Sequence, residues 1–461
     1  MYLQNNVNII QFYAEVWYDS SKVRKGVQPV YRKIYADLQK WKNSTRRKPL
    51  VLQGARQVGK TYTVNLFAQK EYSNYVYCNF EKEEALKDFF TSLDPRRIVK
   101  QLSLYKRKEI IPNHTLIIFD EVQACPQALT SLKYFNEEAN EYHIIASGSL
   151  LGVSVNRGDS SFPVGKVDMI TMYPMDFEEF LLAQKEKYID LIQEIKEAYD
   201  SNVALPTPIH DMAIDLYKQY LYVGGMPEAV KEYVETKNVE IVRIIQKEIL
   251  EAYFNDMGKY NKATEIPKTK LVFENISTQL SKENKKFQYK LLKTGARASL
   301  YEEAIRWICN AGISSQLFRL EQVSFPLESN KSTSDFKFFM GDVGLCGASQ
   351  DVRMEDIEME SNDFEFRGGL AENYINNQLI ANGLKAYYWT SKSDAEVDFI
   401  TRLGANVIPI EVKSGVNTRS RSLESYAKTY HPKYAIRISQ KNFGFENGIK
   451  SIPLYAAFCI K

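Results

Sequence analysis

The stretch GARQVGKT, from Gly54 to Thr61, has the residue types and spacing of a phosphate-binding loop, G-x-x-x-x-G-K-[S/T]. It follows an apolar run, PLVLQ, and precedes a helix-like run, KTYTVNLFAQ, which is the context that such a loop requires. The glycines let backbone N–H groups curl around a phosphate at the N-terminus of the helix, where the dipole favours an anion. The pattern predicts an ATP site in which Lys60 reaches the β and γ phosphates and Thr61 binds Mg²⁺. The residues expected to bind the nucleotide here are Gly54, Ala55, Arg56, Gln57, Val58, Gly59, Lys60, Thr61 and Tyr62.

A second apolar run, TLIIFDE, ends in two carboxylates, Asp120 and Glu121. Behind a phosphate loop, we expect Asp120 to join the Mg²⁺ shell and Glu121 to polarise the attacking water. Taken alone, the run also fits a strand that ends at a solvated acidic turn. A further strand-like run, YHIIASGS, carries Ser147 and Ser149, either of which could sense the γ-phosphate or simply cap the strand. We include Ser147 in the predicted nucleotide site.

A second candidate site is the stretch VDFITRLGANVIPIEVKSG, residues 397–415, which carries Asp398, Glu411 and Lys413. The Glu-x-Lys triplet alone is weak, because it recurs in polar, helix-like surroundings at Glu194, Glu235 and Glu283. Around Glu411, however, the residues are β-branched and apolar, and burial of charge there is costly without a partner or a metal. The pattern fits a metal site or an ordinary hairpin.

Composition sets broad limits on the class of protein. With 461 residues, of which 44% are hydrophobic and 25% charged, the chain is expected to hold several soluble globular domains. A formal net charge of +3 predicts no overall basic field, so any surface for nucleic acid must be local. Five scattered cysteines favour reduced thiols over a disulfide framework or a zinc site. Without a leader-like or membrane-spanning run, we expect a cytoplasmic protein with no membrane partner.

The elements that must position these residues follow from hydrophobic periodicity. Residues 31–180 alternate short apolar runs with helical patterns, which predicts a parallel sheet flanked by helices, an α/β fold. Two or three short helices and then a strand after residue 263 are compatible with a winged helix. The polar stretch LESNKSTSD then indicates a boundary. The predicted division is an N-terminal extension (1–30), an α/β core that carries the phosphate loop (31–180), a helical connector (181–262), a winged-helix-like module (263–325) and a C-terminal α/β domain (326–461).

Basic residues concentrate in SKENKKFQYKLLKTGAR, inside the winged-helix-like module. Such a patch could neutralise backbone phosphates of DNA without reading sequence, although a solvated helix face is the plainer alternative. In the helix that follows, Leu300, Ala304, Ile308 and Ala311 share one face, which we expect to point to the core. The basic residues concerned are Lys282, Lys285, Lys286, Lys290, Lys293 and Arg297.

The runs LVLQGARQVGKT, NYVYCNFE, LIIFDEVQ, IIASGSLL, MYPMDFEEFL and YVGGMPEAV occur in this order, over roughly residues 30–430. In this respect the chain resembles bacterial and archaeal AAA+ ATPases fused to a C-terminal domain of unknown function. The resemblance implies a P-loop AAA+ core with bound ATP and Mg²⁺, a helical lid and a winged-helix module. It also implies a C-terminal domain similar to the PD-(D/E)xK nuclease fold.

A PD-(D/E)xK domain needs a helical acid, a hairpin acid and a Glu-x-Lys on the next strand, which this chain supplies as Glu372, Asp398, Glu411 and Lys413. Asp398, Glu411 and the carbonyl of Val412 could hold Mg²⁺ through oxygen ligands. Lys413 could then act on the attacking water, and Glu372 could bind a second ion or a water. Two alternatives are a fold that persists after its chemistry is lost and an unrelated hairpin.

One departure from the family concerns Lys166, in PVGKVDM, where the family usually has an arginine. Lysine is a point charge and lacks the bidentate clamp of arginine, so whether Lys166 takes the role of an arginine finger is left open. Slow hydrolysis or a nucleotide switch becomes more plausible, and a homo-oligomer is left open. Two functions fit the sequence. One couples ATP hydrolysis to metal-dependent cleavage or remodelling of DNA. The other is a nucleotide-switched module, in regulation or defence, that binds nucleic acid or protein without cutting.

Overall fold

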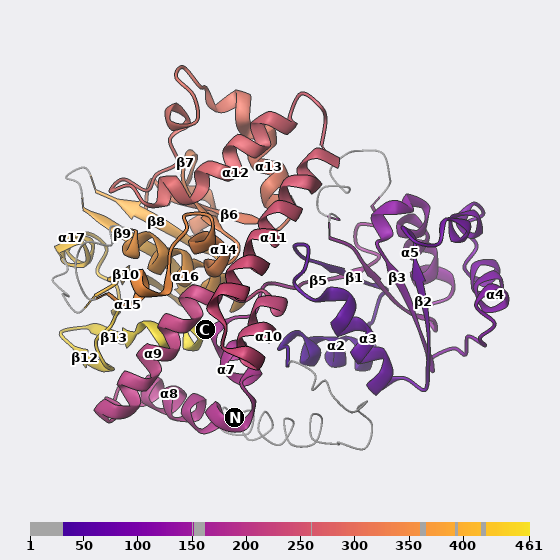
Figure 1. Cartoon of the computed structure of the whole chain (residues 1–461), viewed down its shortest axis with the longest axis horizontal. Helices are drawn as coiled ribbons and strands as arrows, with labels where there is room; N and C mark the ends of the chain where they lie inside the picture. The colour runs from indigo at the N-terminus through magenta and orange to yellow at the C-terminus, as the bar shows by residue number, and fades with distance from the viewer. Residues whose placement is uncertain are drawn as a thin grey trace.

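The computed structural model describes residues 31–149, 151, 162–259, 261–359, 366–391, 395–415 and 421–461. The predicted N-terminal extension, 1–30, lies outside the described residues. Figure 1 shows an N-terminal α/β domain at one side of a larger body, in which helices and a second sheet lie together.

The N-terminal domain is built on a parallel sheet of five strands in the order β2-β3-β4-β1-β5. This confirms the predicted parallel sheet, although its edge strand β5 was not foreseen. The strands are β1 (Leu50–Gln53), β2 (Asn74–Asn79), β3 (Thr115–Asp120), β4 (His143–Ser147) and β5 (Asp168–Thr171). The helices around them are α2 (Ile34–Asn43), α3 (Lys60–Glu71), η1 (Glu84–Phe90), α4 (Pro95–Lys106), η2 (Val122–Ala124) and α5 (Pro126–Glu138).

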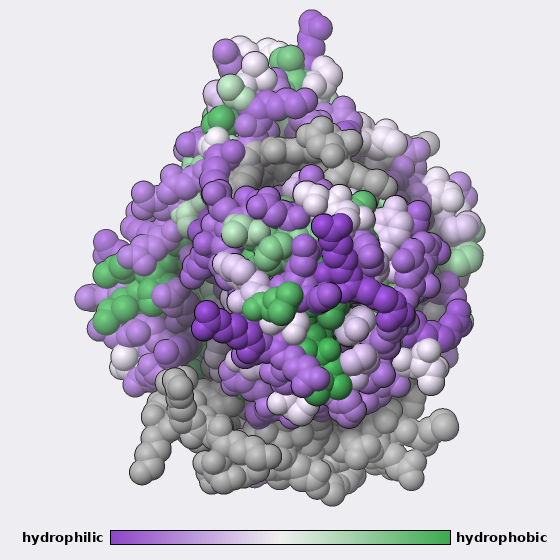
Figure 2. Space-filling view, turned by 90° about the vertical axis from the view of Figure 1, so that its right-hand side faces the viewer, coloured by the Kyte–Doolittle hydropathy of each residue, from purple (hydrophilic) through white to green (hydrophobic). Residues whose placement is uncertain are grey.

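Both faces of this sheet are covered, which explains why its central strands β1, β3 and β4 are mostly apolar and buried, whereas the edge strands β2 and β5 are more polar and more exposed. In β3 every residue is buried, and successive side chains point to opposite faces. Leu116 and Ile118 pack into one core, and Ile117 and Phe119 into another. Figure 2 shows the face of this domain that is turned away from the rest of the chain, which is mostly hydrophilic with small hydrophobic patches.

A helical segment follows, and a glycine pair breaks it at VGGMP. Gly224 has φ of 70°, and a Cβ at Gly225 would lie 1.9 Å from the carbonyl oxygen of Met175. The backbone of Met175 bonds that of Gly225 at 2.7 Å, so only glycine allows the two segments to approach so closely. The helices are α7 (Phe177–Ala183), η3 (Lys185–Tyr188), α8 (Ile189–Ser201), α9 (Thr207–Val223), α10 (Pro227–Thr236) and α11 (Val239–Lys259).

The rest of the chain forms an eight-stranded mixed sheet in the order β12-β13-β11-β10-β9-β8-β6-β7. The hairpin predicted around residue 404 is formed by β9 and β10, which pair in antiparallel register. The strands are β6 (Ser314–Leu320), β7 (Lys331–Met340), β8 (Ala386–Thr390), β9 (Glu396–Leu403), β10 (Asn406–Val412), β11 (Ala435–Ser439), β12 (Gly444–Glu446) and β13 (Ile449–Pro453). The helices are α12 (Ile266–Leu280), η4 (Tyr289–Leu291), α13 (Ala298–Asn310), η5 (Leu327–Asn330), α14 (Val343–Ala348), α15 (Met354–Glu358), α16 (Arg367–Ala381), α17 (Arg421–Tyr430) and η6 (Leu454–Cys459).

The predicted boundary at residue 325 needs correction, because it falls between two paired strands. β6 belonged to the predicted winged-helix-like module, yet it pairs with β7 and also with β8 of the C-terminal region. The polar stretch LESNKSTSD is the connection of a β-hairpin and the start of β7, and one sheet spans both predicted modules. The order of α12, η4, α13 and this hairpin is compatible with a winged helix, which stays a prediction.

Three smaller expectations can be compared with the structure. Ala304, Ile308 and Ala311 are buried as predicted, but Leu300 is 50% exposed, because α13 begins only at Ala298 and its first turn projects from the core. The five cysteines are unpaired. No helix in the described part of the chain combines the length and the apolar character needed to cross a membrane.

Candidate functional site

The predicted phosphate loop connects the carboxyl end of β1 to the start of α3, as its sequence required. Gly54 has φ of 149°, and a Cβ there would lie 2.2 Å from the carbonyl oxygen of Met172. Gly59, with φ of 94°, is the N-cap of α3. Both glycines are therefore required by the path of the backbone, which brings the loop to the N-terminus of a helix, where an anion is favoured.

Lys60 lies across this loop. Its Nζ donates to the carbonyl oxygens of Gly54 and Ala55 at 2.8 and 2.7 Å. The side chain is 8% exposed, and this burial lowers the pKa of Lys60 to about 8. Neutral carbonyl groups hold the ammonium group, so it can exchange them for phosphate oxygens without breaking an ion pair.

Asp120 is the centre of the polar residues around the loop. Its Oδ2 accepts from the hydroxyls of Thr61 at 3.0 Å and Tyr77 at 2.6 Å, and its Oδ1 accepts from Ser147 at 2.6 Å. Asp120 is 3% exposed, and within the described ranges no lysine or arginine forms an ion pair with it. The backbone N–H of Glu121 also donates to Oδ1 of Asp120 at 3.1 Å. A carboxylate beside a hydroxyl offers the oxygen ligands that suit a Mg²⁺ ion held by Asp120 and Thr61.

Glu121 follows Asp120 directly and is held in a left-handed conformation with φ of 51°. Its Oε2 accepts from Nε2 of Gln123 at 2.5 Å, and burial raises the pKa of Glu121. Of the two candidate serines, Ser147 contacts Asp120, whereas Ser149 lines a cavity of about 510 Å³ beside Gly54. The geometry thus distinguishes two residues that the sequence left equivalent.

Several partners of the loop were missed in the sequence, because they come from distant segments. Nη1 of Arg32 donates to the carbonyl oxygen of Val58 at 2.6 Å. Arg56, within the loop, forms an ion pair with Asp256 of α11 at 2.6 Å. Gly312, after α13, lies so close that a Cβ there would be 3.1 Å from the backbone nitrogen of Ala55. The loop is therefore contacted by the N-terminal segment, the helical segment and the C-terminal region.

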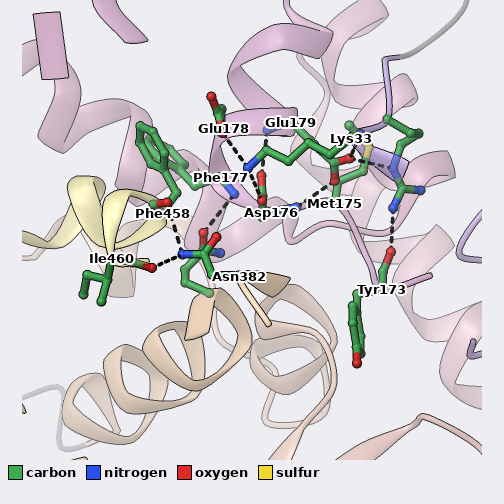
Figure 3. A network of polar contacts seen from close by, with 12 residues as sticks. Lys33, Tyr173, Met175, Asp176, Phe177, Glu178, Glu179, Asn382, Phe458 and Ile460 are labelled. Carbon is green, nitrogen blue, oxygen red and sulfur yellow. Dashed lines mark hydrogen bonds and ion pairs between the residues drawn. The ribbon is translucent and has the colours of Figure 1, made fainter. Parts of the chain in front are cut away.

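Arg32 also connects the loop to a buried network of charges in the stretch MYPMDFEEF, drawn in Figure 3. Its Nε donates to Oε1 of Glu179 at 3.2 Å. Neighbouring Lys33 forms ion pairs with Asp176 and Glu178, both at 2.5 Å. The carboxylates here are almost fully buried, so the network fixes how α7 sits against the N-terminal segment.

The same stretch reaches the C-terminal region. The backbone N–H of Phe177, the first residue of α7, donates to the side chain of Gln378 at 3.3 Å. Gln378 belongs to α16, the helix that also carries Glu372. A chain of polar contacts thus runs from the phosphate loop to the helix of the second candidate site.

Lys166 lies at the opposite end of the N-terminal sheet. It precedes β5, whose first residue, Asp168, pairs with Leu50 at the start of β1, whereas the phosphate loop follows the end of β1. Its Nζ forms an ion pair with Glu137 at 2.8 Å. Lys166 therefore does not face the phosphate loop of its own chain.

The second site brings together the predicted carboxylates of α16, β9 and β10, but with unexpected partners. Lys337 of β7, which is 0% exposed, places its Nζ 2.9 Å from Oε2 of Glu372, 2.6 Å from Oε1 of Glu396 and 3.8 Å from Oδ1 of Asp398. Lys285 binds the other oxygen of Glu372 at 2.5 Å. The helical acid is thus bound by two ammonium groups.

The remaining two residues of the predicted site are arranged beside this cluster. Lys413 forms an ion pair with Oε1 of Glu411 at 2.9 Å, and the backbone N–H of Val412 donates to Oδ2 of Asp398 at 2.8 Å. Oε2 of Glu411 is buried without a hydrogen-bond partner. In the described part of the chain, no group of three or more His, Cys, Asp or Glu side chains is placed to hold a metal ion. The residues do not fit the predicted metal centre.

Charge and burial set the pKa values in this cluster. Burial alone would lower the pKa of Lys337, but the surrounding carboxylates raise it above its usual value. Burial opposes ionisation of Glu372, yet Lys285 and Lys337 lower its pKa to about 2. Burial and then the charge of Glu372 raise the pKa of Asp398 to about 7. The lysines therefore stabilise Glu372 as a carboxylate more than they stabilise Asp398.

The predicted basic patch is only partly free for a ligand. Lys285 pairs with Glu372, and Lys286 pairs with Asp335 at 2.7 Å. On α13 the exposed Arg306 is bound to Glu302 and Glu303, so this helix presents mixed charge. The four basic residues that are exposed are Lys282, Lys290, Lys293 and Arg297.

Comparison with known families fits the geometry of the N-terminal domain. Residues 46–181 match the family model of an AAA domain. The chain carries an AAA+ ATPase-like domain, with the P-loop fold described above. Residues 214–356 and 367–457 match two domains of unknown function, DUF8612 and DUF4143. The AAA+ part of the predicted resemblance is thus confirmed, and the nuclease-like part is not shown.

Among curated proteins, none is similar in sequence to this chain. One solved structure with a partial likeness is the ORC2 protein of Aeropyrum pernix in ADPNP–ADP complexes, with 10% identity and a TM-score of 0.35, covering 73% of this chain and 98% of that chain. Another is the ORC1 protein of the same organism in complex with DNA, with 13% identity and a TM-score of 0.28, covering 69% of this chain and 91% of that chain. The RuvB Holliday junction branch migration motor of Thermotoga maritima is a third (13%, 62% and 90%, 0.28). Likeness at this level carries no function over to this chain.

Proposed function

We propose that the AAA domain binds ATP with Mg²⁺ and hydrolyses it. The observation that carries this proposal is the bonding of Thr61, Tyr77 and Ser147 to the single carboxylate of Asp120, beside a loop that ends at a helix N-terminus. Mg²⁺ takes oxygen ligands and would bind Asp120 and Thr61 in place of the hydrogen bond that now joins them, while Tyr77 and Ser147 keep the carboxylate oriented. A bound Mg²⁺ would neutralise charge that develops on the phosphates.

In this proposal, each group of residues around the loop has its own role in binding or hydrolysing ATP. The backbone N–H groups of Gly54–Thr61 and the start of α3 bind the phosphates. Lys60 moves from its two carbonyl partners to the β and γ phosphates, and Ser147 lies at the end of β4, next to Asp120, where it can sense the γ-phosphate. Glu121 orients the water, and its raised pKa suits a group that accepts a proton during attack.

We further propose that hydrolysis acts on the C-terminal region as a switch. The contacts of Arg56 with Asp256 and of Gly312 with Ala55 place two other segments directly on the phosphate loop. A loop that rearranges around phosphate must change these contacts, and a ligand shifts an equilibrium only through such differences. Cleavage of DNA, and binding of DNA or protein without cleavage, are the two predicted outputs of this switch.

The test of ATPase function compares Lys60→Ala with Glu121→Gln, using a fluorescent ATP analogue for binding and phosphate release for hydrolysis. Lys60→Ala should lose nucleotide binding, whereas Glu121→Gln should bind normally and lose roughly 10²–10³-fold in hydrolysis. Lys100→Ala, an exposed lysine of α4, is the matched control and should match wild type. Unchanged binding in Lys60→Ala would exclude this site.

A further inference from the structure

Lys337 is the least expected charge in the C-terminal region. It lies in the apolar run FKFFM of β7, its side chain has no exposure, and its Nζ contacts carboxylates from α16 and β9. The ring of Tyr388 lies 5.4 Å from the same nitrogen, which adds a cation–π contact. A lysine is buried in this way only when its charge is matched by partners.

The charges of the cluster are already nearly balanced. Three ammonium groups face four carboxylates, so the formal net charge is −1. A Mg²⁺ ion would bring this sum to +1 inside a largely buried site, and it would have to displace ammonium groups from oxygens that they already bind. The groups are Lys285, Lys337 and Lys413 on one side, and Glu372, Glu396, Asp398 and Glu411 on the other.

The oxygen atoms that a metal would need are mostly taken. Both oxygens of Glu372 bind lysines, Oδ2 of Asp398 binds the N–H of Val412, and Oε1 of Glu411 binds Lys413. Oε2 of Glu411 is the buried oxygen that has no partner. A Mg²⁺ ion that used this oxygen together with Oδ1 of Asp398 would have to compete with the ammonium group of Lys337, whose Nζ lies 3.8 Å from Oδ1.

We propose that the ammonium group of Lys337 permanently takes the cation position of this carboxylate cluster, so that the C-terminal region carries its own counter-ion in place of a divalent metal. In this arrangement the cluster ties β7, α16 and β9 together. The region is then not a metal-dependent nuclease. The inference rests on the C-terminal contacts alone, so an ATPase assay can fail or succeed independently of it.

The test measures Mn²⁺ binding to the full chain by the loss of the free-ion EPR signal, without nucleotide and after removal of metals with EDTA. Every protein carries Asp120→Asn, so that only the second site is measured. Lys337→Met removes the charge and keeps most of the volume, and should tighten Mn²⁺ binding at least tenfold over the parent. Lys337→Arg keeps a positive charge and should behave as the parent. Adding Asp398→Asn to Lys337→Met should abolish the gain.

Two results would overturn the inference. One is Mn²⁺ binding by the parent that weakens tenfold on Asp398→Asn, which also decides the matter if Lys337→Met does not fold. The other is divalent-dependent cleavage of single-stranded, duplex or branched DNA by the wild-type chain that is lost in Asp398→Ala and in Lys413→Ala. A parent that neither binds Mn²⁺ at this site nor cleaves DNA supports it.

Discussion

The phosphate loop and the carboxylate cluster of the C-terminal region hold the same kinds of charged residues but pair them differently. Asp120 is bound by three hydroxyls and a backbone N–H, and Lys60 by two carbonyl oxygens, so the hydrogen-bond partners of both are neutral. Glu372 and Lys337 bind one another, so their charges are matched within the chain. A site that awaits an ionic ligand is recognised by charges with neutral partners, and a structural cluster by charges with opposite ones.

The largest expected effect is on stability and should separate the two regions. Glu372→Gln leaves Lys285 and Lys337 with one carboxylate fewer in a buried place, and should lower the free energy of unfolding by about 3 kcal/mol. Asp120→Asn alters a side chain that has no cationic partner, and should change the free energy of unfolding by less than about 1 kcal/mol. Urea denaturation of the two variants compares them. Equal losses would contradict the distinction between the regions.

Activity should show the reverse order. Asp120→Asn should reduce ATP hydrolysis by roughly 10²–10³-fold, because an amide is a poor ligand for Mg²⁺. Asp335→Asn, which neutralises a carboxylate in an ion pair of the C-terminal sheet, is the control and should keep hydrolysis within about twofold. Phosphate release under saturating ATP measures both. Hydrolysis that survives Asp120→Asn would remove this residue from the magnesium shell.

Proton uptake gives a third way to examine the loop. Without nucleotide, the pKa of Lys60 is lowered to about 8 by burial, so above that pH its amine is mostly neutral. Phosphate binds the charged form, and binding above pH 8 must therefore take up a proton. Affinity should fall by up to about tenfold per pH unit there. Calorimetry in buffers of different ionisation enthalpy measures the uptake, which Lys60→Arg should abolish.

A smaller effect is expected at Tyr77, which the sequence did not single out. Tyr77→Phe removes one of the three hydroxyls on Asp120, and should raise the Mg²⁺ concentration for half-maximal hydrolysis about five-fold. Tyr75→Phe on the same strand is the matched control. Nucleotide affinity without Mg²⁺ should be unchanged in both. A loss of that affinity in Tyr77→Phe would indicate a structural role instead.

The smallest effect is expected at Lys166. Because it lies at the far end of the sheet from the loop of its own chain, Lys166→Ala should change hydrolysis by less than about twofold and stability by less than about 1 kcal/mol. Hydrolysis measured over a range of protein concentrations is the test. A tenfold loss that depends on concentration would place Lys166 in the site of a neighbouring copy.

The parts of the first site that follow one another along the chain could be predicted from sequence. The loop, Asp120 and Ser147 come at the ends of apolar strands, and a parallel sheet brings such ends to one edge. Arg32, Tyr77 and Asp256 could not be predicted in this way, because only tertiary packing brings them to the loop. Their side chains sit in ordinary surroundings in the sequence.

The second site shows where the sequence held a signal that was not used. Glu411 attracted attention as a charge inside an apolar strand, and the same reasoning applied to FKFFM would have singled out Lys337. The order of Glu372, Asp398 and Glu411 correctly predicted the helix and the two strands that carry them, whereas Lys413 directly follows the second of these strands. The order of the four residues could not predict that lysines would bind Glu372, because Lys285 and Lys337 lie outside the motif and precede it in the chain.

The sheet that joins β6 and β7 to β8 has a consequence for how this chain can be divided. The match to DUF8612 ends at residue 356, and the match to DUF4143 begins at residue 367. Nevertheless β6, from the first segment, pairs directly with β8, from the second. A protein cut there would leave β6 and β8 with bare edges, which tend to aggregate. We therefore expect the two matched segments to occur together in related proteins, because the sheet is complete only when both are present.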